Sequence, residues 1–165
     1  MRKAWLVCLG LVCLAPGIAS AQGAHPMVTG GGVLQSAAQA HLSVNAIENS
    51  GSQGIAGKIE YHREAQGVIA ELIFHADVRC ADVSSDGMRA VTAGPIREKS
   101  DPANQAAEGD WAVVTVLDMA DGPGDRVRFQ IMSEGDALAD CANADDNTVT
   151  PGTIISGNFQ VRPAP

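Results

Sequence analysis

The feature that most limits how this chain can fold is an alternation of apolar and polar side chains with a period of two. It is clearest in GVIAELIFHADVRCA, residues 67–81, where apolar side chains from Val68 to Cys80 occupy every second position. Successive side chains of a β-strand point to opposite faces of the sheet. The stretch therefore predicts a strand with one core face and one solvent face, and HLSVNAI (41–47) and GIAGKIEYH (54–62) predict two more.

Other segments also predict strands, namely MVTGGGVL, DGMRAVTAGPI, WAVVTVL, RVRFQIM and GTIISGNFQV. No segment predicts a helix of useful length. About eight or nine short strands separated by turn signals are typical of an all-β fold, either a single antiparallel β-barrel or a sandwich, built mostly of sequential hairpins. In a barrel, the first strand (residues 29–34) would pair with the last (154–161) and leave no open edge. The glycines of TGGG would permit a bulge or a tight strand crossing there.

One hairpin is predicted around HREAQG, residues 62–67. The connection is short, so we expect Tyr61 to face Val68 on the core side and Lys58 to face Glu71 on the solvent side. An opposite-charge pair across two strands contributes about 0.2 to 1 kcal/mol and mainly sets the register.

A second hairpin is predicted in LDMADGPGDRVRF, residues 117–129. Pairing Leu117 with Val127 places Asp118 across from Arg126. The Gly-Pro-Gly between the strands suits a tight turn, since Gly accepts positive φ and Pro presets the turn. The stretch needs no ligand to explain its shape.

The same loop also suits a calcium ion, because Asp118, Asp121 and Asp125 and the loop carbonyls could supply several of the six to eight oxygens that calcium prefers. The spacing is not that of an EF-hand. The second acidic stretch, EGDALADCANADDNT, could add further ligands if a disulfide drew it near; these are Asp136, Asp140, Asp145 and Asp146. A calcium site and a solvated turn both remain open at this point.

The N-terminus predicts export. Arg2 and Lys3 precede an apolar run over residues 4–14, and Ala19 and Ala21 provide the small residues that signal peptidase requires. We therefore expect a signal peptide over residues 1–21 and a single all-β domain over residues 22–165. No later segment is long and apolar enough to predict a membrane span.

Two cysteines, Cys80 and Cys141, remain after residues 1–21, since Cys8 and Cys13 lie within the expected signal peptide. In an oxidising compartment they predict one disulfide. Closing a loop of this length stabilises the fold by roughly 4 kcal/mol in the chain-entropy treatment.

The charge disfavours two classes of partner. The chain has 11 Lys and Arg against 19 Asp and Glu, a net charge of −8, which becomes −10 once Arg2 and Lys3 are removed. Such a surface repels nucleic acid phosphates and anionic lipid headgroups. Aromatic residues make up only 4% of the chain, too few for a stacking platform for sugars or bases.

Catalytic motifs are lacking in the sequence. His41, His62 and His75 all fall on solvent faces of predicted strands, and no Gly-x-Ser-x-Gly nucleophile elbow occurs. A zinc site could use His75 and Asp77 with His41 or His62, but nothing specifies a third ligand. We therefore expect no catalytic residues and, apart from calcium, no cofactor.

The segments TGGG, SSDGMRAVTAGPI, VLDMADGPGDRVRFQI and SGNFQV together resemble a group of small secreted bacterial β-domains of uncharacterised function, the post-COAP domains. The resemblance implies a β-rich extracellular domain and no established activity.

Three functional hypotheses follow. The first is an exported, non-enzymatic binding or envelope-associated module whose ligand would be a protein, a glycan or a small apolar molecule. The second is a calcium-stabilised structural module that uses the three aspartates. The third is a small-ligand carrier or enzyme with a barrel cavity, which would require an open, apolar interior.

Overall fold

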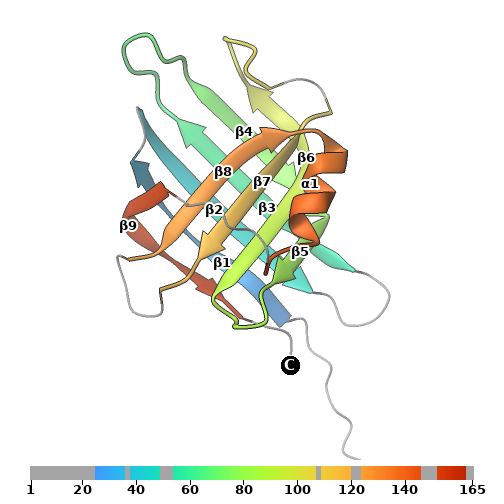
Figure 1. Cartoon of the computed structure of the whole chain (residues 1–165). Helices are drawn as coiled ribbons and strands as arrows, with labels where there is room; N and C mark the ends of the chain where they lie inside the picture. Colours follow the sequence, from blue (N-terminus) through green and yellow to red (C-terminus); the bar gives the residue numbers. More distant parts are fainter. Residues whose placement is uncertain are drawn as a thin grey trace, which may run out of the picture.

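The computed structural model describes residues 25–35, 38–48, 54–106, 109–119, 124–145 and 152–162. Within these ranges the chain is almost entirely β-structure, with one short helix between the eighth and ninth strands (Figure 1). The strands are β1 (His25–Gln35), β2 (Gln39–Glu48), β3 (Ile55–Arg63), β4 (Leu72–Asp77), β5 (Cys80–Val83), β6 (Arg89–Ser100), β7 (Trp111–Leu117), β8 (Arg126–Met132) and β9 (Gly152–Val161), and the helix is α1 (Glu134–Cys141).

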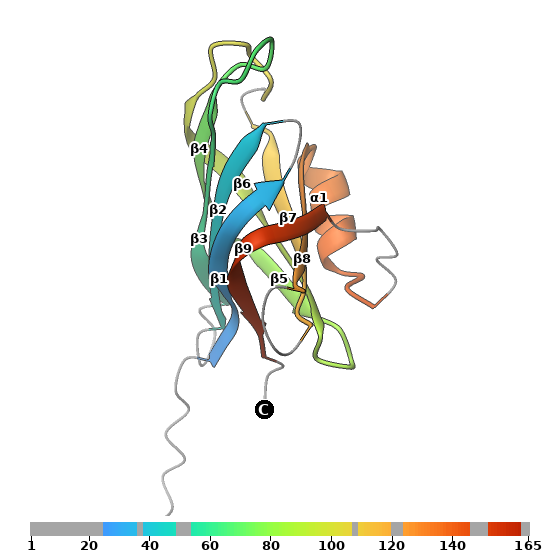
Figure 2. The same cartoon turned by 90° about the vertical axis from the view of Figure 1, so that its left-hand side faces the viewer.

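All strand pairings are antiparallel, and the sheet order is β4-β3-β2-β1-β9-β8-β7-β6-β5 with an additional β4–β6 pairing. Consecutive strands are thus neighbours in the sheet, except β4 and β5, which both pair with β6, and this confirms that the fold consists mostly of sequential hairpins. The strands curl into a half-barrel with two facing layers, β1–β4 on one side and β7–β8 on the other (Figure 2). The all-β expectation is confirmed.

The predicted pairing of the first and last strands is also confirmed. β1 and β9 pair from Val28 opposite Val161 to Leu34 opposite Ile154, with a register shift between Val33 and Leu34. In contrast, the described parts of β8 and β9 share only two residue pairs, Arg126 with Thr153 and Val127 with Gly152. The first strand therefore holds the last strand in place more extensively than β8 does.

The core lies between the two layers and is formed by the inward-facing side chains predicted from the alternation. In β4, for example, Leu72, Phe74 and Ala76 are buried while the residues between them are partly exposed. The rings of Tyr61, Phe74 and Phe129 stack in this interior, with centroids 4.4 to 5.3 Å apart. Close aromatic packing fills the centre of the half-barrel.

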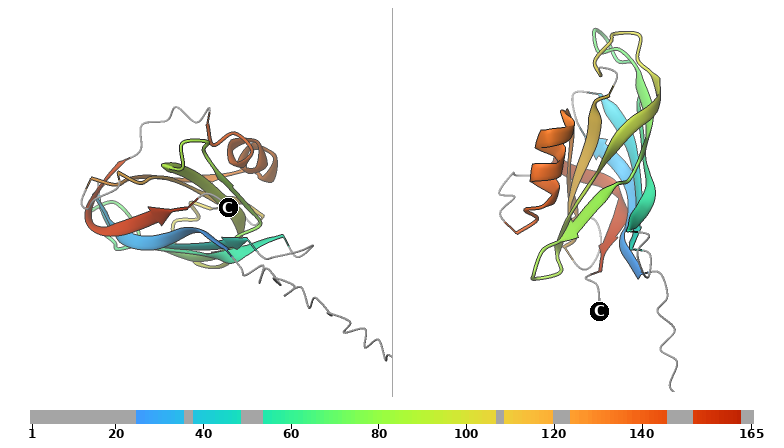
Figure 3. Two further views of the ribbon diagram at one scale, coloured as in Figure 1. Left: turned by 90° about the horizontal axis from the view of Figure 1, so that it is seen from below. Right: turned by 90° about the vertical axis from the view of Figure 1, so that its right-hand side faces the viewer.

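A helix that the sequence did not predict covers the outer face of β5, β6 and β7 (Figure 3). Ser133 caps it, since its hydroxyl accepts a hydrogen bond from the Asp136 backbone N–H at 3.3 Å. Glu134 and Asp136 lie in the first turn, where negative charge stabilises a helix. Ala137 and Cys141 face the sheet and pack in a second core with its outward side chains. The expectation that the chain has no useful helix was wrong.

The predicted register of the β3–β4 hairpin was also wrong. Tyr61 faces Phe74 rather than Val68, and Lys58 faces Asp77 rather than Glu71. The connection is longer than predicted because it contains its own small turn, an isolated bridge between residues 66 and 69. Val68 is fully exposed in this turn instead of lying on the core face. The shift is even in number, so the assignment of β3 and β4 side chains to the two faces still holds.

The β7–β8 register differs by one residue from the prediction, with Leu117 opposite Arg126. The reason is that β7 is buried on both faces. Val114 and Val116 point into the half-barrel, whereas Trp111 and Val113 lie under α1. The predicted pairing of Leu117 with Val127 placed the odd-numbered residues of β7 on the face of Val127, but that face carries Val114 and Val116, so the register is shifted by one residue.

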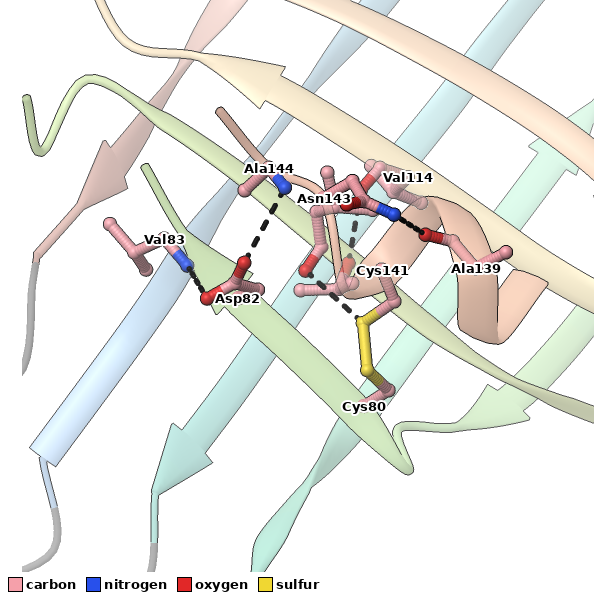
Figure 4. Close-up of a disulfide and its surroundings, with 10 residues drawn as sticks. Cys80, Asp82, Val83, Val114, Ala139, Cys141, Asn143 and Ala144 are labelled. Carbon is pink, nitrogen blue, oxygen red and sulfur yellow. Dashed lines mark hydrogen bonds between the residues drawn. A yellow bond between two sulfur atoms is a disulfide. The ribbon is translucent and has the colours of Figure 1, made fainter. Parts of the chain in front are cut away.

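The predicted disulfide between Cys80 and Cys141 is confirmed, with an S–S distance of 2.08 Å and a Cα–Cα distance of 6.3 Å. It joins the first residue of β5 to the last residue of α1 (Figure 4). Beside it, a carboxylate oxygen of Asp82 accepts a hydrogen bond from the backbone N–H of Ala144 at 3.4 Å. The helix is therefore fastened to the sheet at its C-terminal end.

The expected signal peptide, residues 1–21, lies outside the described residues. In the part of the chain that is described, no helix has the length and apolarity needed to cross a membrane.

Replacing both Cys80 and Cys141 by Ser should lower the free energy of unfolding by up to about 4 kcal/mol, because the cross-link no longer restricts the unfolded chain. The loss should appear in urea unfolding followed by the fluorescence of Trp111, which lies under α1. The wild type measured in reducing buffer is the control and should behave like the double variant. Unchanged stability in both would contradict the structural role assigned to the bridge.

Candidate functional site

An open groove of about 500 Å³ lies on the outer face of β1 to β4 and is bordered by β9. The residues that line it are Gly31, Gly32, Val33, His41, Leu42, Ser43, Glu60, Tyr61, His62, Ile73, His75, Ser156 and Gly157. A concave region with this mixture of apolar and polar groups is the usual form of a small-ligand site.

Strand register places most of these residues in two rows that cross the strands. One row contains Gly31, Ser43, Glu60 and His75, each opposite the next on the neighbouring strand. The adjacent row contains Val33, His41, His62 and Ile73. Side chains that occupy cross-strand positions on one face lie close enough to interact, so each row forms a continuous strip of contacts.

Glycine backbone forms much of the β1–β9 side of the groove, at Gly31, Gly32 and Gly157. Gly157 has a φ of 119°, and a Cβ atom there would lie 2.3 Å from the carbonyl oxygen of Gly31. Only glycine permits this backbone conformation and this approach of the two strands. The glycines that allow the close contact between β1 and β9 therefore also leave this side of the groove without side chains above the backbone at their positions.

The polar groups of the groove are linked to one another. Ser43 Oγ donates a hydrogen bond to Glu60 Oε2 at 3.3 Å, and His75 Nδ1 lies 3.7 Å from Glu60 Oε1. At the rim, His62 Nε2 lies 3.6 Å from Glu71 Oε1, and the His41 and His62 rings are 6.3 Å apart. The side chains of both His–Glu pairs are between 42% and 54% exposed, so solvent and solutes reach them.

This arrangement is not that of a nucleophilic enzyme. A serine nucleophile needs an imidazole that accepts its proton. Here the Ser43 hydroxyl donates to a carboxylate, and the imidazole of His75 lies on the other side of that carboxylate.

The described residues contain no group of three His, Cys, Asp or Glu side chains that could hold a metal ion. The zinc interpretation therefore gains no support from them, and Asp77 instead forms an ion pair with Arg97, with 3.4 Å between Oδ2 and Nε.

The sequence analysis identified the three histidines as exposed but did not group them with Ser43, Glu60 and Ile73. The grouping depends on the β3–β4 register. The predicted register was wrong because the connection between the two strands was assumed to be shorter than it is. Without the correct register, His75 cannot be placed beside Glu60.

The interior of the half-barrel offers less support for a ligand. Tyr61 stacks with both Phe74 and Phe129, and its burial raises the pKa of the phenol, an effect that the charge of Arg63 and a hydrogen bond from it partly offset. The aromatic rings occupy the space that a carrier would keep free.

Two of the three aspartates proposed for calcium have a structural role. Asp125 is 1% exposed; its Oδ1 accepts from the Met119 N–H at 3.1 Å and its Oδ2 from the Phe159 N–H at 2.8 Å. Asp118 Oδ2 accepts from the Val161 N–H at 3.0 Å. These carboxylates tie the β7–β8 connection to β9. Asp121 lies outside the described residues, so the complete calcium site stays a prediction.

The second acidic stretch has partners of its own. Asp136 accepts a hydrogen bond from Ser133 Oγ at 2.7 Å, and Asp140 lies 3.5 Å from Arg128. Asp145 accepts from the Ser85 N–H at 2.8 Å, while Asp146 lies outside the described residues. The described members of this stretch thus stabilise the helix and its surroundings.

Comparisons with known proteins do not extend this picture: no protein-family model, no curated protein and no solved structure matches the chain. The resemblance to the post-COAP domains stays a prediction.

Replacing Asp125 by Ala should destabilise the protein by about 3 kcal/mol, because two backbone N–H groups lose a charged acceptor in a buried position. Asp125→Asn should cost less, since its carbonyl oxygen can still accept one bond. For each variant, the loss in the free energy of unfolding should be the same in EDTA as in millimolar calcium when both are measured by urea unfolding. A loss that appears only in calcium would instead show that the aspartate is a metal ligand.

Proposed function

We propose that this chain is an exported, non-enzymatic binding module whose ligand-contacting surface is the groove on the outer face of β1 to β4. The observation that carries the proposal is the groove itself, which combines two cross-strand rows of apolar and polar side chains with an open side. Export is supported by the predicted signal peptide and by the Cys80–Cys141 disulfide, a bond favoured in oxidising compartments.

The groove suits a small ligand better than a large partner surface. Its volume of about 500 Å³ lies within the range of sites for small molecules. Paired strands form its base, and the ladder of backbone hydrogen bonds keeps that base in one conformation. A preorganised site needs little ordering when a ligand binds, so a modest contact area can give measurable affinity.

The polar groups support binding rather than catalysis. Ser43, Glu60 and His75 can form hydrogen bonds with a ligand, but no imidazole is placed to activate the serine. Among the three functional hypotheses, the first therefore has the most support, since the stacked interior disfavours a cavity carrier and two aspartates of the calcium loop bind backbone groups.

The proposal can be tested with 2-phenylethanol, a neutral probe with an apolar ring and one hydroxyl group. Titration followed by two-dimensional amide NMR should shift the signals of residues in the two rows, with weak affinity. Ile73→Arg should reduce the affinity at least about fivefold, since a charged side chain replaces an apolar contact in the groove. Ala56→Arg is the matched control, as Ala56 is an exposed residue of β3 that does not line the groove.

Shifts confined to residues of the barrel interior would favour the carrier hypothesis. Equal affinities of the Ile73→Arg and Ala56→Arg variants would show that the groove is not the binding surface. No shift at millimolar probe would also contradict the proposal.

A further inference from the structure

We infer that the groove selects small amphiphilic cations, and that the imidazoles facing Glu60 and Glu71, once protonated, compete with such ligands for these two carboxylates. The inference rests on the proposed function, because it names the ligand class of the same groove. Its basis is the position of two half-exposed carboxylates, each facing an imidazole, in and beside a groove that has an apolar side chain at each end, Val33 and Ile73.

The apolar part of the ligand would lie at one of the two ends of the groove, which carry Val33 on β1 and Ile73 on β4. Val33 and Ile73 stand at opposite ends of one row, and the backbone of Gly31 and Gly157 lies next to it. These groups offer dispersion contacts and no charge. An aliphatic or aromatic body of a few carbon atoms matches a space of this kind.

The charged part would contact Glu60, which lies in the middle of the other row. Among the residues that the structure describes, the groove lining includes one acidic side chain, Glu60, and no Lys or Arg; Glu71 follows at the rim beside His62. The carboxylates retain exposed area, so an ammonium or guanidinium group can reach them. The overall charge of −8 favours the approach of a cation and disfavours that of an anion.

The basic residues nearby do not cancel these carboxylates. Lys58 faces Asp77 across the strands, and Arg97 of β6 pairs with the same aspartate. Arg63 donates hydrogen bonds to the Ala70 carbonyl and to Gln105. None of these three cations lines the groove. On the remaining side, Glu98 of β6 is opposite His75 in the strand register.

Protonation would change the charge of this region in a defined direction. With neutral imidazoles, Glu60, Glu71, His41, His62 and His75 carry a formal charge of −2, and with all three imidazoles protonated they carry +1. His75 and His62 stand 3.7 and 3.6 Å from the carboxylate oxygens. As imidazolium groups they would pair with the carboxylates that the ligand needs, and His41 beside His62 would add repulsion. Cation binding should therefore be weaker when the imidazoles are protonated than when they are neutral.

Three probes with the same ring and chain separate charge from apolar contact: 2-phenylethylamine, 2-phenylethanol and phenylacetate. Their dissociation constants should be measured by amide NMR titration of the wild type at about pH 8 and about pH 5. At the higher pH the amine should bind about tenfold more tightly than the alcohol, and phenylacetate most weakly. At the lower pH the amine should lose about tenfold in affinity while the alcohol changes little.

Conservative variants identify the side chains that cause the preference for the amine and the loss of its affinity on acidification. Replacing Glu60 and Glu71 together by Gln should reduce the affinity of the amine at about pH 8 to that of the alcohol. Replacing His75 by Asn and His62 by Gln preserves hydrogen bonding at the positions of Nδ1 and Nε2. This second variant should retain amine binding at the higher pH and lose less than about twofold on acidification.

Equal affinities of the amine and the alcohol for the wild type at the higher pH would overturn the inference while leaving the groove as a binding surface. Tighter binding of phenylacetate at the lower pH would identify an anion site instead. If the His variant loses as much amine affinity as the wild type between the higher and the lower pH, the claim that protonated imidazoles compete with the ligand would be overturned. Failure of the neutral alcohol to bind at either pH would contradict the proposed function itself.

Discussion

The close contact between the first and last strands is the interaction on which the rest of the structure depends. β1 and β9 pair along seven residue positions, and the contact is narrow because Gly30 and Gly157 carry no Cβ. A Cβ on Gly30 would lie 2.3 Å from the Asn158 carbonyl oxygen, and one on Gly157 would lie 2.3 Å from that of Gly31. Without this approach, β9 would have only two residue pairs with β8 to hold it in the sheet. The same glycines leave one side of the groove without side chains at their positions. They therefore determine both the pairing of the first and last strands and the shape of the candidate site.

Other groups reinforce each side of the fold in different ways. On the β9 side, Asp118 and Asp125 accept hydrogen bonds from alternate backbone N–H groups of the last strand. A carboxylate therefore takes the place of a strand partner where the β8–β9 ladder has ended. On the opposite side, α1 covers the outer face of β5 to β7 and the Cys80–Cys141 bridge fastens it there. The outer face of β1 to β4 is left open between these two reinforced regions, and it is the face that carries the groove.

Period-two alternation predicted the strands, the pairing of the first strand with the last and the role of TGGG as a site of close strand approach, because these depend on side-chain parity and on glycine alone. The disulfide followed from the number of cysteines left after the expected signal peptide. Registers were harder to predict. The turn around Gln66 and Ile69 moves the β3–β4 pairing without changing parity, and burial of β7 on both faces removes the signal that distinguishes Val113 from Val114. The candidate site depends on register, so its three histidines could be recognised as exposed but not assembled with Glu60. The helix escaped prediction because its eight residues are mostly acidic or small, and tertiary packing on Trp111 rather than propensity stabilises it.

The most direct test of this account is the free energy of unfolding of Gly157→Ala compared with that of Gly109→Ala. Both glycines have positive φ, 119° and 88°, so both substitutions carry a backbone cost of about 1 kcal/mol or more. They differ in their surroundings, since a Cβ at Gly109 would meet nothing within 4 Å, whereas one at Gly157 would overlap the backbone of β1. We predict that Gly157→Ala loses at least about 2 kcal/mol more than Gly109→Ala, as expected when atoms are forced into a packed contact. Equal losses would contradict the claim that the narrow contact between the first and last strands maintains the fold and shapes its groove.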